Sequence, residues 1–147
     1  MFKFTLEPVL ALKEKMEESK KRELGLATMH QEKVHQEKLV LEKKKEDALN
    51  QVRKQNNQSM DILSIKAFNH YNSYMDRAIK TKGQQLEEAK QKVSEKREEL
   101  LEAVKERKIL DNLKTIYRES FEEEEKRDEQ RILDDIVTYR FGNRGKG

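Results

Sequence analysis

The sequence predicts an all-α protein in which two long helices form an antiparallel coiled-coil hairpin. Three observations predict it: apolar residues return every three or four positions, charged residues cover the positions between them, and one polar stretch interrupts the pattern. Of the 147 residues, 41% are charged and only 34% are hydrophobic, a composition typical of a long exposed helix and not of a globular core. We therefore expect a single coiled-coil domain over residues 1–147, held together by one narrow apolar seam.

The clearest repeat lies in the second half of the chain. Two rows of apolar residues run through it, each with a seven-residue period. The first row is Ile79, Leu86, Val93, Leu100 and, after two basic interruptions, Phe121, and the second row is Ala89, Ala103, Leu110 and Tyr117. The resulting stripe is as wide as a contact with one other helix, so it predicts a single partner helix.

The partner helix is predicted at about residues 6–55. Thr5 can cap its start, and Pro8 is tolerated in its first turn because amides there have no partner in the helix. Its apolar residues at helical spacing are Val9, Leu12, Met16, Ala27, Val34, Leu41, Ala48 and Val52. Gly25 is interpreted as an interruption that costs about 1 kcal/mol relative to alanine, with a local hinge as the alternative.

A polar turn is expected at about residues 55–61, because side chains of this stretch bond to their own backbone. Ser59 or Asp61 can cap the second helix, which is expected at about residues 62–140, before a basic tail at 141–147. Because a helix rises about 1.5 Å per residue, the second helix is expected to be longer than the first. Pairing that proceeds outward from the turn is expected to use up the first helix near Asn112 of the second, so the rest of the second helix extends beyond its partner.

Composition argues against several classes of function. The 32 basic and 29 acidic residues are interleaved, whereas a nucleic-acid binder usually has a face of one sign. We expect no catalytic residue, cofactor or metal site, because cysteine is absent and His30, His35 and His70 lack ligand spacing. No apolar run approaches the roughly 18 residues that span a bilayer, and the start lacks the apolar block of a signal peptide. We therefore expect a cytoplasmic protein that does not insert into the membrane.

Aromatic residues gather near the start of the second helix. Tyr71, Met75, Ala78 and Lys82 fall on one helix face. This face provides either extra packing near the turn or a docking surface, since tyrosine and methionine are favoured at interfaces. The residue pattern leaves both interpretations open.

Three stretches of the chain resemble one known family. They are the opening Phe2–Lys13, with its aromatic pair followed by Leu-Glu and Val-Leu, the tyrosine-rich Ile65–Ile79, and Gln130–Ile136, with its Leu-Asp-Asp element. All three are similar to the flagellar export protein FliJ, a coiled-coil component of the type III export ATPase complex. Asp135 departs from that family's usual glutamate.

The resemblance implies a stalk-like protein without enzymatic activity. In that family the joined helical ends enter the hole of the hexameric flagellar export ATPase and promote its assembly and hydrolysis. The protein also contacts the cytoplasmic part of the membrane export gate and escorts export chaperones. The residues that would face the ATPase are Phe4, Leu6, Leu10, Leu133, Asp134 and Asp135. Those that would face the gate are Tyr71, Met75, Ala78 and Lys82.

The same resemblance implies a monomer when free, cytoplasmic and peripherally associated with the membrane export apparatus. The sequence leaves three alternatives open. One is the corresponding stalk protein of a virulence type III secretion system. Another is a structural scaffold that dimerises with residues 55–61 read through as helix. The third is a helical rod that binds nucleic acid through its basic tail.

Overall fold

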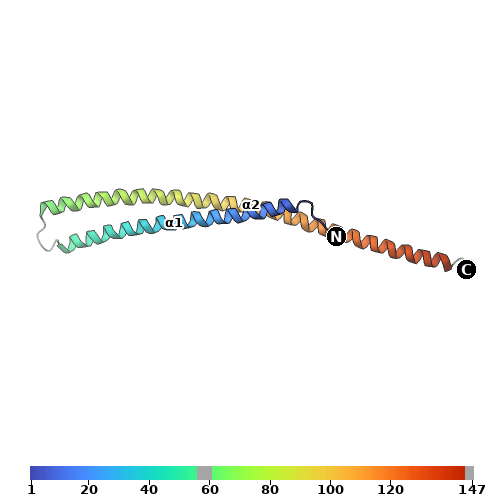
Figure 1. Ribbon diagram of the computed structural model, residues 1–147. Helices are drawn as coiled ribbons and strands as arrows, with labels where there is room; N and C mark the ends of the chain where they lie inside the picture. Colours follow the sequence, from blue (N-terminus) through green and yellow to red (C-terminus); the bar gives the residue numbers. More distant parts are fainter. Residues whose placement is uncertain (56–60, 145–147) are drawn as a thin grey trace. The chain divides into compact units, whose positions relative to one another are not determined.

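The computed structural model describes residues 1–55 and 61–144, without the side chains of the last two. In these ranges the chain forms two helices and no strand, which confirms the all-α prediction. Helix α1 spans Glu7–Gln55 and has 49 residues, and helix α2 spans Ile62–Arg144 and has 83 (Figure 1). The greater length of α2 is also confirmed.

Helix α1 begins after a short turn. The amide of Leu10 donates to the carbonyl of Leu6 at 2.9 Å, the first bond of the helical pattern. Pro8 therefore lies in the first turn, where its missing N–H costs little. The helix continues through Gly25 without interruption. A Cβ added at this position would meet nothing within 4 Å.

Helix α2 begins after Asp61, whose carbonyl accepts the amide of Ile65 at 3.1 Å. Asp61 thus takes the capping position, while Ser59 and most of the expected turn lie outside the described residues. At its other end α2 extends to Arg144, so the first residues of the expected basic tail are helical.

The chain divides into two compact units, each of which contains part of both helices. Unit 1 consists of Met1–Glu17 with Glu102–Gly147, and unit 2 is Glu18–Leu101.

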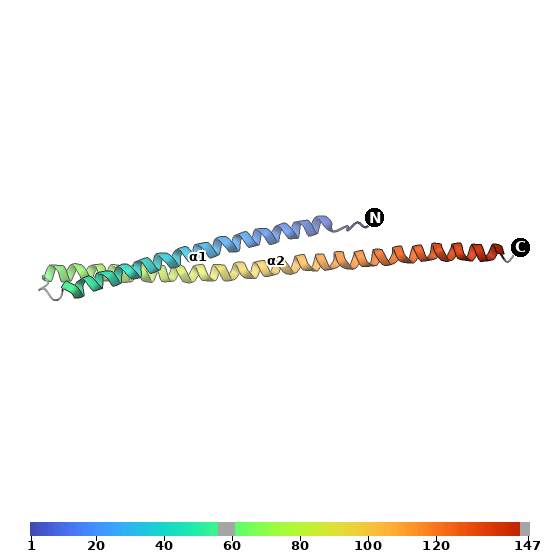
Figure 2. The same cartoon turned by 90° about the horizontal axis from the view of Figure 1, so that it is seen from below.

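In unit 2 the two helices pack antiparallel, and ion pairs between them define the register (Figures 1 and 2). Lys20 contacts Glu99 at 3.2 Å, and farther along α1 Lys45 contacts Asp76. Residue numbers therefore rise along α1 as those of the facing residues on α2 fall, which is the antiparallel arrangement. The buried apolar side chains of this unit are Val34, Met75, Leu86, Ala89 and Val93.

The stripe predicted on α2 is confirmed in both units, since Leu86, Val93 and Ala103 are buried and Leu100 is half-buried. Their seven-residue period keeps one face of α2 turned toward α1. The seam is thus formed by the two rows that the sequence indicates.

The prediction for the start of α1 is wrong. Val9, Leu12 and Met16 are 40%, 55% and 40% exposed, whereas Leu10 and Glu17 are only 2% and 7% exposed. Leu10 and Glu17 are seven residues apart and belong to one row of the seam. The charge of Glu17 hides this register in the sequence, because a row that includes a glutamate is not an apolar stripe.

Unit 1 also extends the pairing farther than expected. A carboxylate oxygen of Glu7 lies 2.8 Å from Nζ of Lys114, and Phe2, ahead of α1, packs on Phe121. The expected limit near Asn112 was too early. The first residues are extended and so cover about 3.3 Å each, against about 1.5 Å for a helical residue. The residues ahead of the turn at Thr5 and Leu6 therefore reach well along α2.

Beyond Phe121, every side chain of α2 from Glu122 to Gly142 is exposed. We call residues 122–142 the free arm; they are part of the orange-to-red stretch of α2 in Figure 2. The free arm is the overhang that the sequence predicts.

The seam predicts different costs for two leucine substitutions in the same helix and unit. Leu86 is 7% exposed and Leu101 is 60% exposed. We expect Leu86→Ala to lower the free energy of unfolding by about 2–3 kcal/mol, because it leaves a cavity. Leu101→Ala should change it by about 0.5 kcal/mol or less. Urea titrations followed by circular dichroism measure both, and equal losses would show that α1 does not cover Leu86.

Candidate functional site

The described residues offer surfaces for function. No group of three or more His, Asp or Glu side chains among them could hold a metal ion. No helix in the described ranges is long and apolar enough to cross a bilayer. His30 and His70 are exposed and His35 is half-buried. The candidate sites are exposed apolar side chains that the seam leaves uncovered.

The free arm carries one such surface. Four aliphatic residues at positions 132, 133, 136 and 137 share one side of the helix. All four are exposed, by 45% to 59%. They are Ile132, Leu133, Ile136 and Val137, which we call the arm stripe. An aliphatic row of this kind on a highly charged helix favours contact with another protein.

Charged and polar side chains border the arm stripe. Asp134 accepts a hydrogen bond from Nε2 of Gln130 at 3.1 Å, and Asp135 is exposed beside it. On the preceding turn Arg131 lies 3.9 Å from Asp128. Both pairs are exposed and each stabilises the helix only slightly, so these side chains can exchange partners at little cost.

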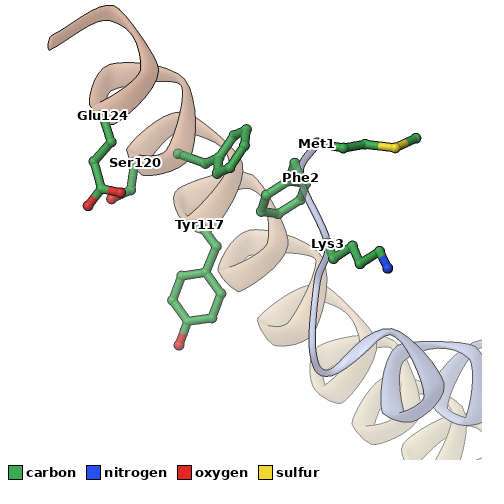
Figure 3. Close-up of a pocket in the computed structure, with 7 residues that line it drawn as sticks. Met1, Phe2, Lys3, Tyr117, Ser120 and Glu124 are labelled. Atoms are coloured by element: carbon green, nitrogen blue, oxygen red, sulfur yellow. The ribbon is translucent and has the colours of Figure 1, made fainter. Parts of the chain in front are cut away.

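An aromatic cluster, which we call the clasp, holds the N-terminal segment on α2 (Figure 3). The rings of Phe2 and Phe121 are 5.7 Å apart and tilted by 53°, and those of Phe4 and Tyr117 are 5.8 Å apart and tilted by 58°. The guanidinium of Arg118 lies 5.7 Å from the centre of the Phe2 ring. Tilted aromatic pairs and a cation over a ring are both attractive, so the clasp fixes where the free arm begins.

The structure separates the six residues that the resemblance assigns to the ATPase. Phe4 and Leu10 are buried against α2, and Leu6 is half-buried. Leu133 is exposed on the free arm, as are the two aspartates that follow it. Leu133 lies twelve residues beyond Phe121, or roughly 18 Å along the helix. The N-terminal three thus support the base of the arm, and the C-terminal three are available to a partner.

The resemblance omitted the other three residues of the arm stripe. Ile132, Ile136 and Val137 are as exposed as Leu133 and share its side of α2. Their spacing along a helix that has outrun its partner is a signal that the sequence already contains.

A second exposed surface lies near the start of α2, in unit 2. Tyr71 and Tyr74 are exposed, Ala78 is half-buried, and Nζ of Lys82 binds a carboxylate oxygen of Glu37 across the seam. A hollow beside Tyr74 is lined by Leu41, Arg77, Ala78, Thr81 and Lys82. We call Tyr71, Tyr74, Ala78 and Lys82 the tyrosine face.

Met75 does not share the exposure of the other predicted gate-facing residues. It is 3% exposed, because it lies fourteen residues before Ala89 in the same seam row and faces α1. Met75 therefore supports the tyrosine face from beneath. Tyr74, which the sequence-based set left out, occupies the exposed position next to it.

Four charged residues form a network across the seam of unit 2. Nζ of Lys20 and Nζ of Lys96 each lie 3.2–3.3 Å from carboxylate oxygens of both Glu23 and Glu99. Hydrogen bonds from Lys20 and then Lys96 lower the pKa of Glu23, and those from Lys96 and then Lys20 lower the pKa of Glu99. The hydrogen bonds that both lysines donate to Glu99, and then those they donate to Glu23, raise the pKa of each lysine.

A more buried pair crosses the seam of unit 1. Glu17 accepts a hydrogen bond from Nε of Arg107, whose Nη1 also donates to Asp111. The bond to Glu17, and secondarily that to Asp111, raises the pKa of the guanidinium. A buried charge is costly without its partner, so these residues favour the one register in which they meet.

A protein-family model described as the flagellar FliJ protein matches residues 2–146. No curated protein and no solved structure matches the chain. The family match covers both helices, the clasp and the free arm.

The network around Lys96 predicts a pH dependence of stability. The lowered pKa values of Glu23 and Glu99 mean that their stabilisation is complete above about pH 4.5, the ordinary value, and is lost as the pH falls through the folded-state pKa. Lys96→Met removes a cation shared by both carboxylates. Its urea midpoint should therefore fall less than that of the wild type between about pH 6 and about pH 3.

The matched control is Lys90→Met, which removes an exposed lysine from the same helix. Its pH dependence should follow the wild type, and identical curves for the Lys96 and Lys90 variants would mean that the network does not contribute.

Proposed function

Because the chain belongs to the flagellar FliJ family and is a component of the flagellar export apparatus, we propose that it is a stalk-like, non-enzymatic activator of the hexameric export ATPase. In this proposal the free arm enters the central hole of the hexamer. The proposal extends to contact with the cytoplasmic part of the export gate and to the escort of export chaperones. The free protein is proposed to be monomeric, cytoplasmic and peripherally associated with the membrane export apparatus.

The observation that carries the proposal is the arm stripe. A lone helix presents four aliphatic side chains that α1 does not cover, bordered by Asp134 and Asp135. A helix of this kind docks by burying its aliphatic row, and each fully buried side chain contributes about 1.5–3 kcal/mol. The two aspartates add a charge that selects a basic surface on the partner.

Activation follows from unequal contact with six equivalent subunits. A single helix has one apolar side, so only part of a ring can bind that side at a time. Subunit conformations that bind the arm stripe better are stabilised relative to the others, and this difference in binding free energy shifts their populations. Phe4 and Leu10 contribute indirectly, since they fix the base of the arm.

Contact with the export gate is proposed for the tyrosine face. Tyrosine is enriched among residues that dominate interface energies. Tyr71 and Tyr74 are exposed, and each lines a separate hollow in which an anchor side chain can rest. Met75 holds the backbone beneath them in place. Escort of chaperones is supported by membership of the family alone.

The first test uses the purified export ATPase. We expect the wild-type chain to raise the rate of ATP hydrolysis, and Leu133→Asp or Ile136→Asp to require at least about tenfold more protein for the same effect. Leu26→Asp, at an exposed leucine of α1, is the control and should match the wild type. An unchanged rate with the wild-type chain, or full stimulation by both stripe variants, would refute the proposal.

The second test separates the two surfaces. Tyr71→Ala should weaken binding to the purified cytoplasmic part of the gate by about tenfold, because it removes an interface anchor. It should leave ATPase stimulation unchanged. Tyr139→Ala, at an exposed tyrosine of the free arm, is the matched control and should retain gate binding in the same titration. Equal losses for the two tyrosines would place the gate contact elsewhere.

A further inference from the structure

Six apolar side chains of unit 1 lie on one edge of the helix pair, outside the seam. Five of them are exposed and Leu113 is half-buried. They are Val9, Leu12 and Met16 of α1 and Ile109, Leu113 and Ile116 of α2, which we call the third-helix face. Neither the arm stripe nor the tyrosine face includes any of them.

Their position on one edge follows from the register. Val9 and Met16 each precede a seam residue of α1 by one position, and Leu113 precedes the seam residue Lys114 of α2. In an antiparallel pair, positions that precede the seam on the two helices lie on the same edge. Leu12, Ile109 and Ile116 are three or four residues from these positions, so they extend the same surface outward.

The opposite edge of the seam has a different character. Glu7 binds Lys114 there, and Asp111 binds Arg107. Both acidic residues follow a seam residue by one position, so they mark the edge away from Val9 and Leu113. The edge away from Val9 and Leu113 thus carries charged pairs, while the edge with Val9 and Leu113 presents aliphatic side chains from both helices beside the Lys13–Glu106 pair.

Two antiparallel helices with apolar residues along a common edge provide two sides of a three-helix bundle. A third helix can bury a row of its own between them, as the a and d positions of a coiled coil do. Val9, Leu12 and Met16 span two turns of α1, long enough for a helical segment of a few turns.

The charges around the third-helix face favour binding of an acidic partner helix. Lys15 on α1 and Lys105 on α2 are exposed at its two borders. The acidic residue on this edge, Glu106, is bound by Nζ of Lys13 at 2.8 Å, and Glu102 and Glu119 lie beyond the ends of the face. Lysines on both borders attract a helix whose apolar row is flanked by carboxylates.

We propose that the third-helix face binds one amphipathic α-helix of another protein, with an apolar row flanked by Glu or Asp, to form a three-helix bundle with α1 and α2. This site is additional to the ATPase and gate contacts proposed above. Its occupant adds a helix without displacing the seam, so binding leaves the fold intact.

The test uses a fluorescently labelled synthetic peptide with leucine at its a and d positions and glutamate at e and g. Fluorescence anisotropy with the full-length chain should show saturable binding. Leu12→Glu and Ile109→Glu should each weaken it by about tenfold or more, because each places a carboxylate in the apolar contact. Leu26→Glu and Ile65→Glu, at exposed positions outside every surface defined above, are the controls and should bind as the wild type does.

Charge is tested separately. A second peptide with lysine in place of glutamate should bind the wild type about tenfold more weakly than the first peptide does. Lys105→Glu should reduce this difference in affinity between the two peptides. Circular dichroism is used to check that each variant retains its helix content. Equal binding of both peptides, or equal loss in the control variants, would overturn the proposal. So would a concentration-dependent dimer that Leu12→Glu abolishes, because a second copy would then be the occupant.

Discussion

The structure depends on a seam between α1 and α2 that is only two rows of side chains wide. Val34, Leu86 and Val93 are buried in it. A seam this narrow removes little apolar surface from water per residue, so each position counts. Unit 2 and unit 1 both contain stretches in which charged side chains replace apolar ones and must find a partner across the seam.

That requirement turns ion pairs into determinants of register. Glu17 is buried and accepts a hydrogen bond from Arg107 on the opposite helix, and Lys13 likewise contacts Glu106. Sliding one helix by a single position would move these charges away from their partners and rotate the apolar rows out of contact. Apolar burial holds the helices together, and the charged positions select one alignment.

A narrow seam also leaves most of each helix uncovered, and this is where function is supported. The arm stripe, the tyrosine face and the third-helix face each consist of apolar side chains at a place where one seam contact cannot cover them. They use different residues, which allows a flagellar export component to contact several partners without competition for one surface.

The residue pattern predicts the helical class, the antiparallel pairing, the longer second helix and the rows on α2, because a seven-residue period and a polar turn are local properties of the chain. The placement of Leu10 and Glu17 in the seam, in place of Val9 and Met16, became visible only in the folded protein, since a charged residue is stable at a seam position when a partner lies opposite. The tertiary structure also decided that Met75 faces inward and that the extended N-terminal residues clasp Phe121. These outcomes depend on contacts between residues far apart in the chain, which periodicity along one helix does not encode.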